Sequence, residues 1–339
     1  MTGNAVLETR GLSIGYKRPK HPVCVVAGNI DAALRAGQFV CLLGPNGTGK
    51  STLIRTLAGM QVPLAGTVLV KGSPLHTLSA RALARQMSLV LTDRVAVGMM
   101  PVISFVALGR HPYTSWTGRL RREDREAVHR AIADTGIEAL AHQPVCELSD
   151  GETQKVKIAR ALAQEPQIML LDEATAFLDL PRRVELMALL GRLAHDSGRA
   201  ILLSTHDLDL ALRSADRLWL LSPGGPLREG VPEDLVLDNA FSATFSDGGI
   251  AFDKGSGSFV VAARERGAVT LHGDGVPAMW TYRALERAGY RVLPDGAAPV
   301  SVRVLMEGER PAWRICEGTE CSCASLEELL AVLNGRFAS

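Results

Sequence analysis

The stretch Gly44-Pro-Asn-Gly-Thr-Gly-Lys-Ser51 has the spacing G-x-x-x-x-G-K-S. It follows the apolar run Phe39–Leu43 and precedes residues 51–60, which have helical spacing. Glycine leaves backbone N–H groups accessible to an anion and permits unusual dihedral angles. The helix that begins near Gly49 would point its positive end at the same anion. The pattern therefore predicts a strand, a phosphate-binding loop and a helix in succession.

Two side chains of this loop have specific predicted roles. Lys50 should bridge the β- and γ-phosphate oxygens of bound ATP, and Ser51 should be a ligand of Mg²⁺. The other predicted nucleotide contacts come from the rest of the loop and the start of the helix: Gly44, Pro45, Asn46, Gly47, Thr48, Gly49 and Thr52.

A second motif lies about 120 residues further along the chain. Residues 168–171, Ile-Met-Leu-Leu, form an apolar run that is followed by Asp172 and Glu173. Asp172 would hold Mg²⁺ through its water shell. Glu173 would lie near the strand tip, where it can polarise an attacking water. Together with the phosphate loop, the pair indicates a P-loop NTPase that uses ATP and Mg²⁺.

The order of apolar runs predicts an α/β fold. Residues 168–171 and 201–203 are near-continuous apolar runs, as expected for strands buried on both faces of a parallel sheet. The charged residues 121–135 predict a helix that ends at Gly136. Residues 246–258 are rich in Gly, Ser and Asp and predict a loop or linker.

A second α/β pattern follows this linker. Residues 268–271 and 300–305 are strand-like and residues 276–288 are helix-like. Ser325 and Glu328 predict a capping box that opens a last helix, with Gly335 past its end. We therefore expect two domains, residues 1–240 and a smaller one at residues 241–339.

Composition limits the classes of function. The 339 residues are 47% hydrophobic and 22% charged, with a formal net charge of +1, which argues against nucleic-acid binding by bulk charge. The sequence shows no signal-peptide pattern and no apolar run near the roughly 20 residues that span a bilayer. Cys24, Cys41 and Cys146 lie among apolar neighbours, so we expect packed thiols in a reducing compartment. Cys316, Cys321 and Cys323 could hold a metal or pair by oxidation, although their spacing matches no standard zinc pattern.

Further motifs resemble those of ATP-binding-cassette (ABC) ATPases. Leu148-Ser149-Asp150-Gly151-Glu152 resembles the L-S-G-G-Q signature, about 20 residues before Asp172. Residues 176–179 resemble the D-loop, which ends in Asp179, and residues 204–207 resemble the switch-histidine motif with His206. Tyr16 stands where the family has an aromatic that stacks on adenine. The resemblance covers about 220 residues in the family's order.

This resemblance implies a homodimer that holds two ATP molecules, each between the phosphate loop of one copy and the signature of the other. In that arrangement Ser149 and the Gly151 amide contact the γ-phosphate across the interface, since both lie at a helix start. His206 contacts the same phosphate and helps to hold the attacking water. Asp179 is carried over as a nucleotide-site residue of the D-loop.

The resemblance also implies the fold. It predicts a P-loop NTPase cassette with a mostly parallel core sheet, an antiparallel β-subdomain and a helical signature subdomain, followed by the small C-terminal α/β domain.

The sequence departs from the family pattern at two places. Asp150 and Glu152 replace the usual Gly and Gln of the signature, which adds two carboxylates near a triphosphate unless Lys155 or Lys157 neutralises them. Thr92 stands where the family has the Q-loop glutamine. A threonine hydroxyl can donate to water or metal but has a shorter reach.

Residues 105–113, which contain Ala-Leu-Gly-Arg, resemble the ATPases of importers for iron–siderophore, haem and cobalamin compounds. The resemblance implies a separate multi-spanning permease, a periplasmic or lipid-anchored substrate-binding protein, and a peripheral place on the cytoplasmic face of the inner membrane. Arg110, Tyr113 and Trp116 would form an aromatic and basic surface that receives a permease helix.

Several alternatives to this function remain open. An exporter ATPase and a non-transport ATP-dependent clamp both fit the same cassette. We expect the C-terminal domain to regulate the cassette or to extend its dimer contact. The glycine loop at residues 271–275 could instead bind a small anion.

Overall fold

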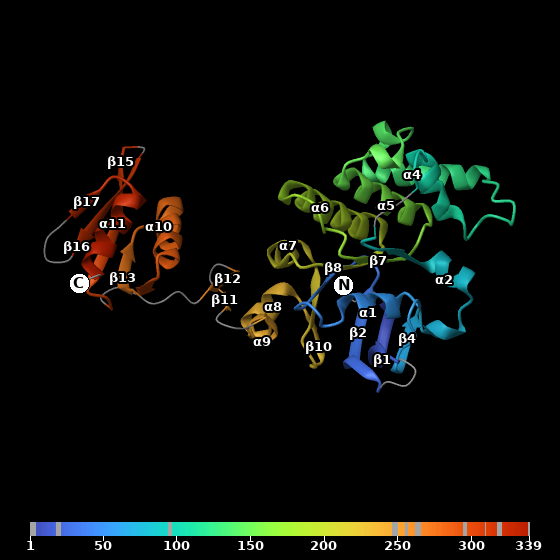
Figure 1. Ribbon diagram of the computed structural model, residues 1–339, viewed down its shortest axis with the longest axis horizontal. Helices are drawn as coiled ribbons and strands as arrows, with labels where there is room; N and C mark the ends of the chain where they lie inside the picture. The colour runs from blue at the N-terminus through green and yellow to red at the C-terminus, as the bar shows by residue number, and fades with distance from the viewer. Residues whose placement is uncertain are drawn as a thin grey trace. The chain divides into compact units, whose positions relative to one another are not determined.

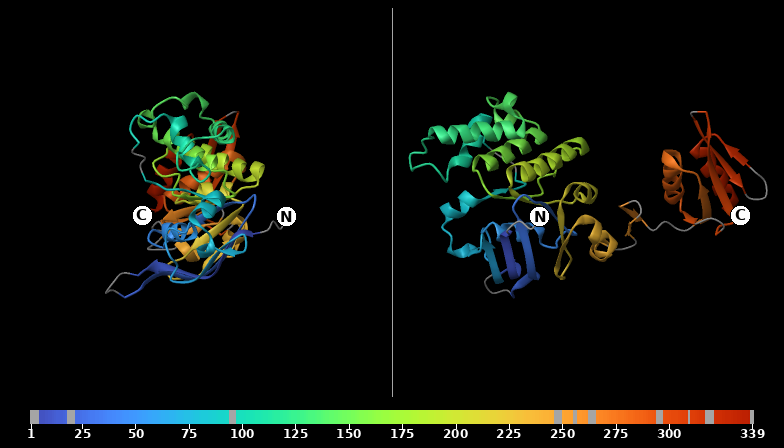
Figure 2. Two further views of the ribbon diagram at one scale, coloured as in Figure 1. Left: turned by 90° about the vertical axis from the view of Figure 1, so that its right-hand side faces the viewer. Right: turned by 180° about the vertical axis from the view of Figure 1, so that it is seen from behind.

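The computed structural model describes residues 5–17, 22–93, 97–245, 250–254, 257–261, 266–293, 297–308, 310–316 and 321–337. The chain divides into two compact units, Met1–Phe259 and Val260–Ser339 (Figures 1 and 2). No helix in the described part of the chain is long and apolar enough to cross a bilayer.

The first unit is built on a six-stranded sheet. Its strand order is β10-β9-β3-β8-β7-β6, and every neighbouring pair is parallel except β10–β9. All residues of β3, β7 and β8 are buried, which explains their continuous apolar sequences. The strands are β3 (Phe39–Leu43), β6 (Met87–Val90), β7 (Ile168–Asp172), β8 (Ala200–Ser204), β9 (Arg217–Leu221) and β10 (Leu227–Gly230).

The two faces of this sheet belong to two hydrophobic cores. Phe39, Cys41 and Leu43 face a core that includes residues of α3 (Val102–Ala107), α5 (Asp150–Ala163) and α6 (Leu180–Ser197). The alternate residues Val40 and Leu42 face a core that includes α1 (Lys50–Leu57) and the antiparallel strands. The sheet therefore lies between a helical layer and a β layer (Figure 1).

The β layer is a four-stranded sheet with the order β2-β1-β4-β5, and all its pairs are antiparallel. Its strands are β1 (Ala5–Tyr16), β2 (Cys24–Arg35), β4 (Ala65–Val70) and β5 (Ser73–Pro74). The predicted parallel core sheet and antiparallel subdomain are thus both confirmed.

The helical layer contains the predicted signature subdomain. In it, α3 and α5 pack together with α4 (Arg122–Thr135), which ends at Gly136 in the left-handed conformation, as predicted. The remaining helices of this unit are α2 (Ala80–Gln86), α7 (Leu208–Ser214), α8 (Pro232–Leu237) and α9 (Ala240–Phe245). Short 3₁₀ turns occur at Leu75–Thr77, Leu108–Arg110, Glu138–Leu140 and Val145–Glu147.

Part of the predicted linker is a β-hairpin. Strands β11 (Ile250–Asp253) and β12 (Ser258–Val261) pair where a loop was expected, while residues 246–249 and 255–256 lie outside the described residues. The reason is an aromatic cluster: the Phe252 ring lies 5.1 Å from Phe241 and 5.0 Å from Phe259. Phe245 lies 5.7 Å from Phe259. These rings attach the hairpin to α9.

The second unit is a small α/β domain. Its sheet has the order β14-β13-β15-β16-β17, in which β13 is parallel to both neighbours and the pairs from β15 to β17 are antiparallel. Its elements are β13 (Gly267–His272), α10 (Gly275–Arg287), β14 (Tyr290–Leu293), β15 (Val300–Glu307), β16 (Arg310–Cys316), β17 (Cys321–Cys323) and α11 (Leu326–Phe337).

The last helix departs from prediction at its end. Ser325 accepts a hydrogen bond from the Glu328 amide (3.1 Å), as predicted. Gly335, however, lies inside α11 and does not follow it. The helix continues because Phe337 packs against Tyr290 at 5.3 Å between ring centroids. Tertiary packing therefore outweighs the helix-breaking tendency of glycine.

Candidate functional site

The phosphate loop joins β3 to α1, as predicted. Its glycines are structurally required, because a Cβ on Gly44 would lie 2.4 Å from the carbonyl oxygen of Leu221. A Cβ on Gly49 would lie 2.4 Å from Val26, and Gly49 also has φ 99°. The loop therefore exposes backbone N–H groups at the start of α1, in a geometry suited to phosphate oxygens.

Lys50 lies folded inside this loop. Its ammonium donates to the carbonyl oxygens of Gly44 (2.7 Å) and Pro45 (3.1 Å). Burial lowers the pKa of Lys50, and the nearby carboxylates of Glu173 and Asp172 act in the opposite direction. The two printed contacts of this buried cation are to neutral carbonyl oxygens, so its charge remains available to an anionic ligand.

Asp172 and two hydroxyl groups form the predicted metal end of the site. Ser51 Oγ donates to Asp172 Oδ1 at 3.0 Å, and Ser204 Oγ donates to the same oxygen at 2.7 Å. Thr92 Oγ1 donates to the backbone carbonyl of Asp172 at 2.9 Å. The hydroxyl and carboxylate oxygens of Ser51 and Asp172 are the hard ligands that Mg²⁺ prefers.

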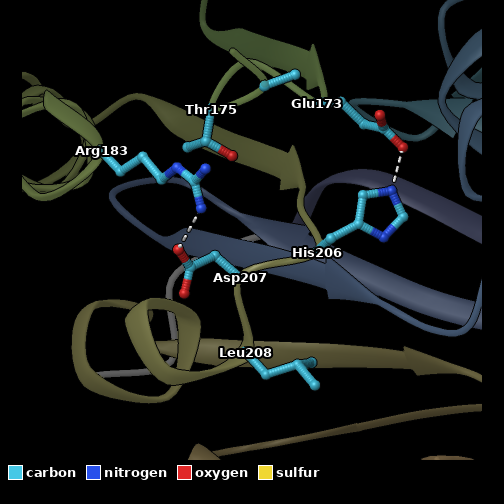
Figure 3. Close-up of a pocket in the computed structure, with 7 residues that line it drawn as sticks. Glu173, Thr175, Arg183, His206, Asp207 and Leu208 are labelled. Atoms are coloured by element: carbon cyan, nitrogen blue, oxygen red, sulfur yellow. Dashed lines mark hydrogen bonds and ion pairs between the residues drawn. The ribbon is translucent and has the colours of Figure 1, made fainter. Parts of the chain in front are cut away.

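Glu173 lies at the junction of β7 and the following turn. Its backbone has φ 49°, a left-handed conformation that is uncommon for glutamate. Its N–H donates to Ser204, to the carbonyl oxygen at 3.1 Å and to Oγ at 2.9 Å. The side chain contacts His206, with Oε1 2.5 Å from Nε2 (Figure 3).

Tyr16 lies beside the phosphate loop. Its hydroxyl is 2.9 Å from Thr52 Oγ1, and the side chain is 43% exposed. It lines a pocket together with the loop and with Glu173 and His206, which follow β7 and β8. The residues of this pocket are Tyr16, Val26, Asn46, Gly47, Gly49, Lys50, Ser51, Thr52, Glu173 and His206.

The described lining of this pocket lacks four predicted nucleotide residues that lie in or beside the loop and strand ends, Gly44, Pro45, Thr48 and Thr92. It also lacks three that lie at the starts of other helices, Ser149, Gly151 and Asp179. Ser149 caps the N-terminus of α5, and Asp179 caps α6 by accepting from the Arg182 amide at 3.1 Å. Exposed apolar side chains lie near Asp179, namely Phe177, Leu180 and Val184. This geometry is consistent with a contact between these residues and another molecule.

Comparison with known proteins agrees with this geometry. Residues 27–176 match the ABC transporter family, and residues 266–334 match the iron ABC transporter C-terminal domain. An uncharacterised ABC transporter ATP-binding protein of Methanocaldococcus jannaschii is 41% identical over 231 residues, which cover 68% of this chain and 78% of the relative.

This chain belongs to the ABC transporter ATP-binding proteins.

Two other relatives carry functional names. The achromobactin transport ATP-binding protein of Dickeya dadantii is 36% identical over 238 residues, covering 70% of this ABC ATPase and 86% of the relative. The cobalamin import ATP-binding protein of Halobacterium salinarum is 35% identical over 310 residues, which cover 89% of this chain and 75% of the relative. Among solved structures, the dimeric bacterial ABC transporter cassette MJ0796 has a TM-score of 0.58 and is 25% identical. The match covers 67% of this chain and 98% of MJ0796.

The prediction that Arg110 lies on an exposed surface that receives a permease helix is wrong. The side chain of this residue is buried in the ABC ATPase and pairs with Asp124 (2.9 Å) and Glu165 (2.7 Å). Tyr113 lies under the Arg110 guanidinium at 3.9 Å and donates to the Gln164 carbonyl. Arg110 and Tyr113 therefore hold the helical subdomain together. Trp116, which is 97% exposed, remains a surface residue.

Sequence reasoning gave no role to Ser204, the residue that binds both Asp172 and the Glu173 amide. The register pairs Asp172 directly with Ser204 on the neighbouring parallel strand. A polar residue at the end of an otherwise apolar strand was the signal. Which strand lies next to β7, however, follows only from the tertiary topology.

Proposed function

We propose that this chain is the ATP-hydrolysing subunit of an ABC importer, and that it powers uptake of an iron–siderophore, haem or cobalamin-type compound through a separate membrane permease. The observation that carries the importer class is the match of residues 266–334 to the iron ABC transporter C-terminal domain. Relatives named for achromobactin transport and cobalamin import support the same class of cargo.

The contacts around Glu173 support the proposed catalytic roles. Its carboxylate accepts the proton of the attacking water as a general base. His206 Nε2 lies 2.5 Å from Glu173 Oε1, which supports a role for His206 in orienting this carboxylate. We expect His206 also to contact the γ-phosphate. Lys50 stabilises the negative charge that develops on the phosphate oxygens.

Mg²⁺ fits the donors at the end of β7. Ser51 and Asp172 would hold it, since their oxygens already converge at 3.0 Å. When bound, the ion supplies charge neutralisation at the β- and γ-phosphates. Ser204 keeps the Asp172 carboxylate in place, and Thr92 fixes the adjoining backbone.

The remaining nucleotide contacts divide between two copies of the chain. Within one copy, Tyr16 stacks on adenine, and the loop from Gly44 to Thr52 binds the phosphates. From the second copy, Ser149, Gly151 and Asp179 reach the same nucleotide. The exposed apolar side chains of Phe177, Leu180 and Val184 support such a contact, because exposed apolar groups near one another favour a partner.

A separate groove suits the permease. It is formed by α2 and the segment after the Leu108–Arg110 turn, and it is mostly apolar. Its described lining consists of Ala80, Arg81, Ala84, His111, Pro112, Thr114, Ser115 and Trp116. An exposed tryptophan at the side of an apolar groove is typical of helix-in-groove recognition. The ATPase would accordingly be peripheral, on the cytoplasmic face of the membrane.

Transport direction can be measured in the native host. A strain that lacks the chain is complemented with the parent chain or with Glu173→Gln, and accumulation of a labelled ferric siderophore, haem and cobalamin is followed. Importer function predicts that the parent restores accumulation of one cargo and that Glu173→Gln does not. Increased retention of cargo in the deleted strain would indicate an exporter, and no change with any cargo would favour a non-transport clamp.

A further inference from the structure

Ser149, at the start of α5, forms a hydrogen bond that competes with its proposed contact to the γ-phosphate. Ser149 Oγ donates to Glu152 Oε2 at 2.6 Å, and the Ser149 N–H donates to the same oxygen at 2.9 Å. The hydrogen that would reach a γ-phosphate therefore points to a carboxylate of its own subunit. These two bonds to Ser149 are also the main reason that the pKa of Glu152 is lowered.

Two cations near the signature, Lys155 of α5 and Arg182 of α6, pair with Glu185. Lys155 Nζ donates to Glu185 Oε1 at 2.6 Å, and Arg182 Nη1 donates to Glu185 Oε2 at 3.1 Å. Both cations also act on Glu152, where they help to lower its pKa. The four side chains have no net charge as a group, because Lys155 of α5 and Arg182 of α6 together balance the carboxylates of Glu152 and Glu185.

Arg182 links the signature to the D-loop. Its aliphatic stem covers Gly151, since an added Cβ there would lie 3.6 Å from Arg182 Cδ. Its backbone amide is capped by Asp179. Arg182 thus contacts both the signature and the D-loop, the two segments that are proposed to bind the nucleotide of a second copy.

We propose that Glu152 and Arg182 are positioning residues of the ATP sandwich: Glu152 holds the Ser149 hydroxyl in the open subunit, and Arg182 attracts the Glu152 carboxylate when Ser149 turns to the γ-phosphate bound by a second copy. The inference rests on the proposed function, because it requires two copies to close on ATP. No covalent step is involved. Closure exchanges one acceptor of the Ser149 hydroxyl for another.

The physical reason is the sign of the charges. A free Glu152 carboxylate repels the triphosphate, and it competes with the phosphate for the same O–H donor. Arg182 opposes both effects, since it neutralises Glu152 and adds positive charge beside the helix N-terminus that faces the phosphate. Removal of the carboxylate should therefore strengthen closure, and removal of the cation should weaken it.

The test measures ATP-dependent dimerisation by sedimentation in chains that carry Glu173→Gln to prevent turnover. Arg182→Gln should weaken the dimer about tenfold, which is about 1.4 kcal/mol and is shared by the two such sites of each dimer. Glu152→Gln should strengthen it by a similar factor. The double variant should lie closer to the Glu173→Gln parent than Arg182→Gln does, since the two residues act on each other.

Controls separate this role from a structural one. Arg192→Gln removes an exposed cation from the same helix away from the signature and should leave the dimer unchanged. Arg182→Lys should restore most of the affinity that Arg182→Gln loses. With Glu173 intact, Arg182→Gln should raise KM for ATP more than it lowers kcat. ATP binding to the monomer confirms that each variant is folded.

Two results would overturn the inference in distinguishable ways. Equal dimerisation of the parent, Arg182→Gln and Glu152→Gln would refute the positioning role and leave the sandwich intact. If even the Glu173→Gln parent fails to dimerise with ATP, the sandwich of the proposed function is wrong, and the inference fails with it.

Discussion

Glu173 is the residue at which backbone and side-chain observations converge. Its left-handed backbone costs energy, of the order of 1–3 kcal/mol for such conformations, and two hydrogen bonds from its amide to Ser204 stabilise it. The same conformation holds its carboxylate against His206. This use of an unfavourable conformation is consistent with a catalytic position.

Glu173→Gln should retain ATP and trap a closed dimer. The amide keeps the shape of the side chain but cannot accept a proton, so hydrolysis should fall by about 10²- to 10⁴-fold. Phosphate release and nucleotide retention after gel filtration measure the two effects. Lys50→Ala is the contrasting variant, because it should lose productive nucleotide binding altogether. Rapid turnover by Glu173→Gln would show that another group is the base.

At the scale of elements, the apolar runs predicted the buried strands well. Residues 168–171 and 201–203 belong to β7 and β8, because a strand covered on both faces is apolar over most of its length. The sequence could not predict the partner of Arg110, since the sequence Ala-Leu-Gly-Arg gives no sign of burial. Asp124 on α4 and Glu165 after α5 meet this guanidinium only when the helices pack.

Arg110→Ala should destabilise the helical subdomain. It leaves Asp124 buried without its cation, which typically costs about 3–5 kcal/mol. Chemical denaturation measures the free energy of unfolding. Arg122→Ala is the matched control, because Arg122 forms an exposed pair with Glu126 and should cost less than about 0.5 kcal/mol. Equal stability of the two variants would contradict this account.

The same pair predicts a dependence on pH. Burial raises the pKa of Asp124, but hydrogen bonds from the Arg121 amide and the Arg110 guanidinium outweigh this and hold it below its ordinary value of 3.8. Because the pKa of Asp124 is lower in the folded state, its carboxylate stabilises the fold at pH values above the ordinary pKa. This stability is lost as the pH falls through the lowered pKa. Acid unfolding of Arg110→Ala should therefore begin at a higher pH than that of the parent chain.

Trp116→Ala should weaken the contact with the permease. Removal of an exposed aromatic anchor from the groove beside α2 should reduce recovery of the permease by about tenfold or more, as for a hot-spot residue. Quantitative recovery from solubilised membranes measures this. Trp280→Ala is a control with the same change at an exposed tryptophan in the second unit. Equal recovery with both variants would remove the groove from the proposed interface.

At the scale of the whole molecule, the existence of two units was predictable, but the structure of the segment between the two α/β patterns was not. Glycine, serine and aspartate in residues 246–258 predicted a linker, yet Phe252 and Phe259 pack on Phe241 and Phe245. Two phenylalanines in a polar segment were the available signal. Their partners are known only from the fold. The functional division at residue 240 stays a prediction.

Truncation should separate the roles of the two units. A chain that ends at residue 261 keeps the aromatic cluster and should fold and bind ATP, but it should show weaker dimerisation or altered ATPase activity. A chain that ends at residue 245 loses Phe252 and Phe259 and should be less stable by about 3 kcal/mol or more. Unchanged activity and dimerisation of the longer truncation would leave the C-terminal unit without the proposed regulatory or dimer role.

The most direct test of the importer assignment is recovery of the partner. The tagged Glu173→Gln chain is expressed in its native host, membranes are solubilised in mild detergent with MgATP, and co-purifying proteins are identified, with Lys50→Ala in parallel. We expect a multi-spanning permease to co-purify, with or without a periplasmic or lipid-anchored binding protein. Recovery of ribosomes, of DNA-associated proteins or of no partner would leave the ATPase site standing and contradict the transport function.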